Sequence, residues 1–142
     1  MKKLSLFLIS ASSLLLLSSC VDRVQADKKL ERGCGAGVAL YVPEGFSIKE
    51  TKGATFSDAK AGEGDRRVAL TVVQSDGWYD EEKTYFCNFA ESFGFLKMSH
   101  TAEIYQIDLG DGRVFGKKDG NIVGGFAEWQ KITGAVDKAL GH

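Results

Sequence analysis

Short stretches of β-prone residues, separated by turn-forming residues, make up most of the chain after residue 37. The predicted strands cover residues 38–42, 46–49, 54–57, 68–73, 103–109, 113–118 and 122–123. The run at 68–73 is apolar except for Thr71, which is typical of a buried central strand. Asp-Gly pairs at 111–112 and 119–120 favour hairpin turns between the later strands.

Two stretches show the spacing of a helix instead. In the first, apolar residues recur at intervals of three and four: Phe86, Phe89, Phe93 and Leu96. Carboxylates at 80–82 precede it, where they favour the start of a helix. The second stretch has the same spacing near the C-terminal end: Phe126, Trp129, Thr133, Val136 and Leu140. The order is therefore strands, helix, strands, helix, and we expect an α+β fold with both helices packed on an antiparallel sheet.

The N-terminal residues have the parts of an export signal. Lys2 and Lys3 are followed by an apolar run at 4–17 that only serines and Ala11 interrupt, and then by small residues and Cys20. The run has about 14 residues, whereas a membrane-spanning helix needs about 20. The pattern predicts a cleaved signal, with an uncleaved membrane anchor and an ordinary secretory signal as the alternatives.

The segment Leu-Ser-Ser-Cys at 17–20 resembles the lipobox of bacterial lipoproteins. The resemblance implies that residues 1–19 are removed and that the thiol of Cys20 receives a diacylglyceryl group. Each buried methylene contributes about 0.8 kcal/mol, so two or more chains give a stable anchor. Val21 and then Asp22 follow the cysteine. In a Gram-negative organism with enteric-type sorting, the resemblance implies an outer-membrane protein that faces the periplasm.

This interpretation divides the chain into a signal peptide at 1–19, a lipidated cysteine with a polar tether at 20–33, and one globular α+β domain at 34–142. The tether is charged, and Val21, Val24 and Leu30 are the large apolar residues in it. The alternative for this segment is a helix docked on the domain.

The cysteine count predicts one disulfide. With Cys20 lipidated, Cys34 and Cys87 remain, 53 positions apart, and an oxidising compartment favours pairing them. A free or catalytic thiol and a metal site are the alternatives. His100 and His142 are the two histidines of the chain, and with two distant cysteines they make a poor zinc set. We therefore expect neither a metal nor a cofactor.

Charge argues against nucleic acid as a partner. The chain has 18 basic and 19 acidic residues, and removal of Lys2 and Lys3 shifts the formal net charge from −1 to −3.

Motifs for phosphate loops, zinc proteases and nucleophile elbows are absent from the sequence. The glycines at 33, 35 and 37 precede a predicted strand, so we interpret them as a flexible entry that lets Cys34 reach Cys87. His100, between the predicted helix and strand, is interpreted as a loop residue, with a catalytic base beside Ser99 or Cys87 as the alternative.

Trp78 and Tyr79 are the candidate binding residues, because they lie in a predicted loop among four carboxylates. Three roles stay open for them. The first is packing in the core beside the start of a helix, and the second is contact with a protein or glycan. The third is metal binding by the surrounding carboxylates. The spacing of the carboxylates does not match an EF-hand loop.

The order of elements, with Val-Pro-Glu-Gly-Phe at 42–46 and the apolar strand at 68–73 before a helix, resembles the Mog1/PsbP-like fold over residues 38–140. That resemblance implies a binding or assembly factor rather than an enzyme. The sequence thus predicts a lipid-anchored envelope lipoprotein with a non-catalytic binding or assembly role, held at the membrane through Cys20, with an envelope protein or a glycan as partner. The alternatives are a small envelope hydrolase acting on glycan or peptide, and a structural or surface-exposed lipoprotein with no specific ligand.

Overall fold

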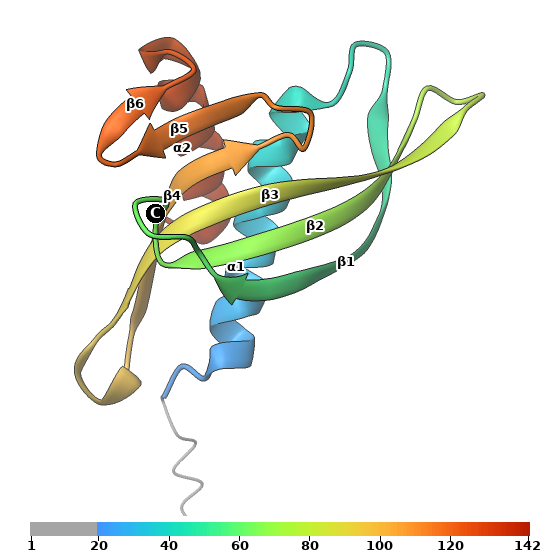
Figure 1. The fold of residues 1–142 in the computed structure, drawn as a ribbon. Helices are drawn as coiled ribbons and strands as arrows, with labels where there is room; N and C mark the ends of the chain where they lie inside the picture. Colours follow the sequence, from blue (N-terminus) through green and yellow to red (C-terminus); the bar gives the residue numbers. More distant parts are fainter. Residues whose placement is uncertain (1–19) are drawn as a thin grey trace, which may run out of the picture.

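The computed structural model describes residues 20–142, which form a six-stranded antiparallel sheet and two helices (Figure 1). The strands are paired in chain order: β1 (Ser47–Asp58), β2 (Arg66–Ser75), β3 (Asp80–Phe93), β4 (His100–Asp108), β5 (Val114–Lys118) and β6 (Asn121–Val123). Helix α1 (Arg23–Val38) precedes the sheet and α2 (Phe126–Leu140) follows it. Both helices cover the same face of the sheet, so the predicted α+β fold, an antiparallel sheet with two packed helices, is confirmed.

The first helix lies where the sequence predicted a tether, so the assignment of residues 20–33 to a tether is wrong and the docked-helix alternative is correct. Asp22 caps this helix, because its side chain accepts a hydrogen bond from the backbone N–H of Gln25 (2.7 Å). One helix face is fully buried: Ala26, Leu30, Cys34 and Val38. The predicted strand at 38–42 is also wrong, because the chain leaves α1 through a short 3-10 turn at Ala39–Tyr41.

Two glycines of α1 bring it close to its neighbours. A Cβ atom at Gly33 would lie 2.9 Å from a methyl group of Leu140 in α2, and one at Gly37 would lie 2.6 Å from a methyl group of Ile107 in β4. These glycines are therefore required for close packing within a helix, and the interpretation of 33–37 as a flexible entry is wrong.

The predicted helix over residues 86–96 is strand β3 instead. Tyr85, Cys87 and Phe89 alternate along it and are fully buried under the helices. Phe86 lies on the opposite face, where the guanidinium of Arg67 stacks 4.3 Å from its ring centroid. The phenylalanines that recur at intervals of three and four therefore lie on both faces of a strand and not on one face of a helix. Ten consecutive residue pairs with β2 hold the segment extended.

The remaining strands agree closely with the predictions. The two predicted strands at 46–49 and 54–57 form one long strand, β1, whose pairing with β2 shifts register just before Gly53. β5 and β6 are joined by Asp119-Gly120, both with positive φ (50° and 78°), as a tight hairpin turn requires. The predicted C-terminal helix is α2, and it buries Ile132, Val136 and Leu140.

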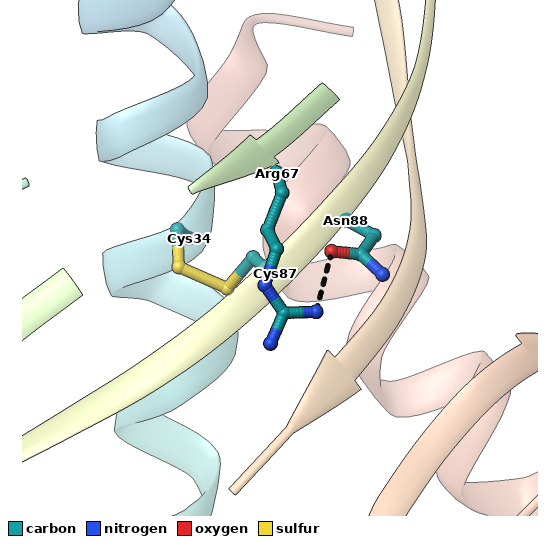
Figure 2. The surroundings of a disulfide bond; sticks show 4 residues. All are labelled: Cys34, Arg67, Cys87 and Asn88. Carbon is teal, nitrogen blue, oxygen red and sulfur yellow. Dashed lines mark hydrogen bonds between the residues drawn. A yellow bond between two sulfur atoms is a disulfide. The ribbon is translucent and has the colours of Figure 1, made fainter. Parts of the chain in front are cut away.

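A disulfide between Cys34 and Cys87 connects the buried face of α1 to the middle of β3 (Figure 2). Both cysteines are fully buried, and their Cα atoms are 5.6 Å apart. The predicted disulfide is thus confirmed. It lies inside the hydrophobic core, so a free or catalytic thiol at either position is excluded.

We expect that replacing both cysteines, Cys34→Ala with Cys87→Ala, lowers the free energy of unfolding by about 4 kcal/mol, because the bond closes a loop of 53 residues in the unfolded chain. Denaturant unfolding of the purified protein, with and without reductant, measures the change. Ser47→Ala with Ser57→Ala is the control, because both serines are exposed and lie outside the bond. A wild-type protein whose stability is unchanged by reduction would contradict the prediction.

Candidate functional site

The predicted binding residues Trp78 and Tyr79 form the tip of the turn between β2 and β3. Trp78 is 99% exposed and Tyr79 is 61% exposed, so the core-packing alternative is wrong. The carboxylate of Asp76 accepts hydrogen bonds from the backbone N–H groups of Tyr79 (2.7 Å) and Trp78 (2.9 Å). These bonds favour the ionised carboxylate and lower its pKa. The turn is therefore ordered by its backbone while both rings are free to make contacts, and a binding role for them stays a prediction.

Changing both Trp78 and Tyr79 to alanine should leave the thermal midpoint within about 2 °C of the wild type, because exposed side chains contribute little to stability. The matched control is Tyr85→Ala, a fully buried tyrosine whose removal should cost about 3 kcal/mol or more. A double variant that melts as low as the Tyr85 variant would show that the rings pack in the core.

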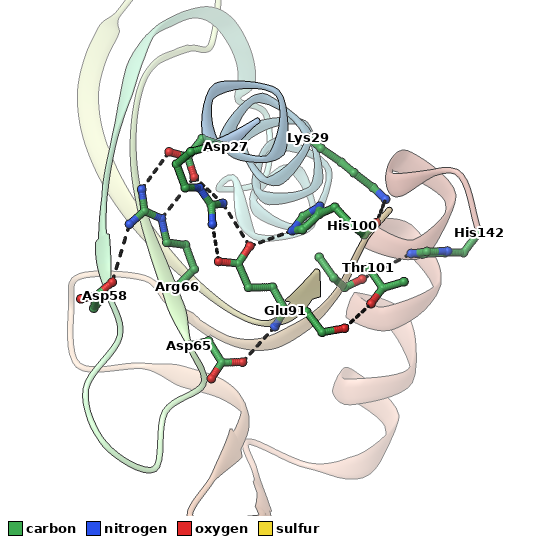
Figure 3. A network of polar contacts seen from close by, with 12 residues as sticks. Asp27, Lys29, Asp58, Asp65, Arg66, Glu91, His100, Thr101 and His142 are labelled. Carbon is green, nitrogen blue, oxygen red and sulfur yellow. Dashed lines mark hydrogen bonds and ion pairs between the residues drawn. The ribbon is translucent and has the colours of Figure 1, made fainter. Parts of the chain in front are cut away.

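His100 is not the loop residue that the sequence predicted. It begins β4, its side chain is buried, and its Nε2 atom lies 2.7 Å from a carboxylate oxygen of Glu91. Glu91 also accepts two hydrogen bonds from the guanidinium of Arg23, at 2.6 and 3.0 Å. Arg23 comes from α1, so this cluster joins the first turn of the helix to β3 and β4 (Figure 3).

A second buried acid extends the cluster along α1. Asp27 accepts two hydrogen bonds from Arg66 of β2, at 3.1 and 2.8 Å, and it also pairs with Arg23 at 2.6 Å. The Arg23–Asp27 spacing of four residues could have been found from the sequence, had the segment been interpreted as helical. The partners on the strands are 39 or more positions away, and no local pattern identifies them.

Burial raises the pKa of Glu91, but hydrogen bonds from Arg23 and His100 outweigh it and hold the pKa below the ordinary value of 4.5. A carboxylate with a lowered pKa stabilises the fold above its unfolded-state pKa, and this stability is lost as the pH falls through the folded-state pKa. Both oxygens of Glu91 are also occupied, so it is poorly suited to act as a general acid.

We predict that Glu91→Gln destabilises the protein by about 3 kcal/mol at neutral pH, because it removes a buried carboxylate that accepts two hydrogen bonds from the Arg23 guanidinium and contacts the buried ring of His100. The wild type should lose stability as the pH falls below the ordinary glutamate pKa of 4.5, and the variant should lose less over the same range. Urea unfolding at several pH values measures both. The control is Glu103→Gln, at an exposed position of β4 that forms no ion pair within residues 20–142. Equal pH profiles for wild type and Glu91→Gln would contradict this role of the ionised carboxylate.

A groove of about 650 Å³ lies between β4 and α2. It is lined by residues 101–104 of β4, by residues 90–92 of β3 with Asp65, and by Trp129, Thr133 and Asp137 of α2 with His142. Its strand side is an open sheet edge: β5 pairs with residues 106–108 of β4, and within residues 20–142 no strand pairs with the outer side of residues 100–105.

Side chains cap this open edge where a neighbouring strand would otherwise bind. The carbonyl group of Ala102 accepts a hydrogen bond from the ring of His142 (3.3 Å), and that of His100 accepts one from the Lys29 ammonium (3.3 Å). Figure 3 shows His142 beside Thr101 at this edge. Because side chains rather than a strand occupy these positions, another chain can displace them and pair with the backbone of β4.

The groove is acidic. Four carboxylates line it, those of Asp65, Glu91, Glu103 and Asp137. The guanidinium of Arg23 pairs with the Glu91 carboxylate, and His142 is the one basic residue among those that line the groove. Trp129 supplies an apolar wall, and its ring is contacted by the Lys117 ammonium 5.1 Å from the centroid. The site thus combines backbone hydrogen-bonding groups, an aromatic surface and negative charge.

Within residues 20–142, no group of three or more histidine, cysteine or acidic residues has the arrangement of a metal site. In the same part of the chain, no helix is long and apolar enough to cross a membrane. The predicted signal at 1–19 lies outside the described residues. Cys20 is described, and its thiol is exposed.

Comparisons of the chain with models of known protein families, with curated proteins and with solved structures find no match. The resemblance to the Mog1/PsbP-like fold therefore stays a prediction from the order of elements, as does the lipoprotein resemblance of the N-terminus.

Proposed function

We propose that the chain is a lipid-anchored, non-catalytic binding protein of the cell envelope, and that its groove holds an extended segment of a partner protein. The lipobox-like sequence at 17–20 supports the anchor. The observation that carries the binding role is the open edge of β4 facing α2 across the groove.

Addition of a strand is the recognition mode that suits this edge. An extended peptide pairs with free backbone groups of an edge strand, and its alternate side chains enter the adjoining groove. Residues 101–104 supply the strand, while Trp129 and Thr133 of α2 lie where the alternate side chains would point. Displacement of the His142 ring would free the Ala102 carbonyl to accept a hydrogen bond from the backbone of the peptide.

The negative lining favours a segment with basic side chains. Glu103 and Asp137 come from opposite sides of the groove and form no ion pair within residues 20–142. A lysine or arginine placed between them would be attracted by both carboxylates, whereas an acidic segment would be repelled. The proposed ligand class is thus an extended, basic peptide segment of an envelope protein, rather than a glycan.

The test uses the full chain, purified in detergent after processing, and two labelled peptides of equal length with alternating Val-Lys or Val-Glu sequence. Fluorescence anisotropy should show the Val-Lys peptide binding at least about tenfold more tightly than the Val-Glu peptide. Methylation of alternate backbone nitrogens in the Val-Lys peptide should abolish binding, because it removes the donors that pair with β4.

A charge reversal in the groove, Glu103→Lys with Asp137→Lys, should weaken the Val-Lys peptide by about tenfold or more. The matched control is Glu82→Lys with Glu44→Lys, which makes the same change in net charge at two exposed positions outside the groove. Equal losses in the groove variant and the control would show non-specific attraction only. Unimpaired binding of the methylated peptide would refute strand addition.

A further inference from the structure

The turn between β3 and β4 carries exposed apolar side chains. We call its residues Phe95, Leu96, Lys97 and Met98 the apolar tip. Phe95 is 82% exposed, Leu96 is 69% exposed and Met98 is 56% exposed. Three neighbouring apolar side chains on one turn are an unusual arrangement for a surface in contact with water only.

The apolar tip lies against the residue at which the anchor begins. The backbone N–H of Val21 donates a hydrogen bond to the carbonyl of Lys97 (2.8 Å), and the Cys20 thiol lies 3.5 Å from the carbonyl oxygen of Leu96. Figure 1 shows the β3–β4 turn and the start of α1 side by side at one end of the molecule, far from the β2–β3 turn.

We propose that the apolar tip enters the interfacial layer of the membrane beside Cys20, so that the domain is held at two adjacent points. This inference rests on the proposed anchor. A lipid attached at Cys20 brings the bilayer to within contact distance of Leu96, and the exposed rings and side chains then leave water. Lys97 lies in the same turn and is exposed, so its ammonium can reach lipid phosphates while its neighbours are buried.

Part of the backbone of the apolar tip is already hydrogen-bonded within the protein. The carbonyl groups of Gly94, Phe95 and Lys97 accept hydrogen bonds from the backbone N–H groups of Lys97, Met98 and Val21, respectively, and the N–H of Gly94 donates to Ser99. Backbone groups paired in this way avoid the cost of entering an apolar layer unsatisfied.

The conformation of the tip is also unfavourable for its residues. Leu96 and Lys97 have φ values of 51° and 57°, in the left-handed region that side chains other than glycine avoid. Leu96 thus combines an unfavourable backbone conformation with a large apolar side chain that is exposed. Such strain at an exposed apolar turn indicates a function that depends on the tip.

The test attaches an environment-sensitive fluorophore to the full chain through Leu96→Cys, with Trp78→Cys as the matched control at the opposite end. The unsubstituted chain gives the background labelling of Cys20. Each processed protein is reconstituted into vesicles of phosphatidylethanolamine and phosphatidylglycerol that contain a lipid spin-labelled high on its acyl chain. Flotation reports anchoring, and quenching by the spin label reports depth.

We expect both proteins to float with the vesicles, with the fluorophore at 96 quenched about twofold or more and the one at 78 unquenched. Flotation without quenching at 96 would overturn the membrane contact and leave the anchor intact. Equal quenching at 96 and 78 would also overturn it, because no defined end of the domain would then face the bilayer. Failure to float would refute the anchor itself, and this inference with it.

Discussion

The attachment of α1 to the sheet is the constraint on which the rest of the structure depends. The disulfide between Cys34 and Cys87 fixes the middle of the helix to β3. Arg23 fixes its first turn to Glu91, and the small residues Gly33 and Gly37 allow α2 and β4 to approach it closely. Both helices cover the same face of the sheet, and Leu30, Cys34 and Val38 of α1 belong to the core between the helices and the sheet.

This attachment also sets the geometry of the proposed functions. Because the helix begins three residues after Cys20, the proposed anchor would be attached almost directly to the folded domain. The apolar tip therefore stays beside Cys20, and the β2–β3 turn lies at the other end of the molecule (Figure 1). The groove along β4 begins next to the buried pair of Glu91 and His100, so the ionic cluster that holds α1 also supports one side of the proposed peptide site.

Features governed by local chemistry could be predicted from the sequence. Turn dipeptides located the last strands, helical spacing located α2, and cysteine arithmetic identified the disulfide. The N-terminal helix was missed because its buried face consists mostly of small residues, with Ala26, Gly33 and Gly37 giving little hydrophobic periodicity. β3 was misinterpreted because aromatic residues on both of its faces imitate the spacing of a helix.

The candidate site was beyond the reach of local patterns for a different reason. The groove exists because β5 pairs with only the last part of β4, and its acidic lining comes from segments more than 70 positions apart. His100 resembled a loop residue because its partner Glu91 lies across the hairpin. Trp78 and Tyr79 were visible in the sequence, but their exposure depended on a turn that was expected to lead into a helix.

Native-state hydrogen exchange of the backbone amides in α1 tests the central claim most directly. If the helix is an integral part of the fold, the amides of Leu30 and Cys34 should exchange through global unfolding, within about tenfold of the amide of Val72 in β2. Exchange of the α1 amides faster than Val72 by several orders of magnitude would mean that the helix detaches from a folded sheet, and would contradict the dependence of the core on α1.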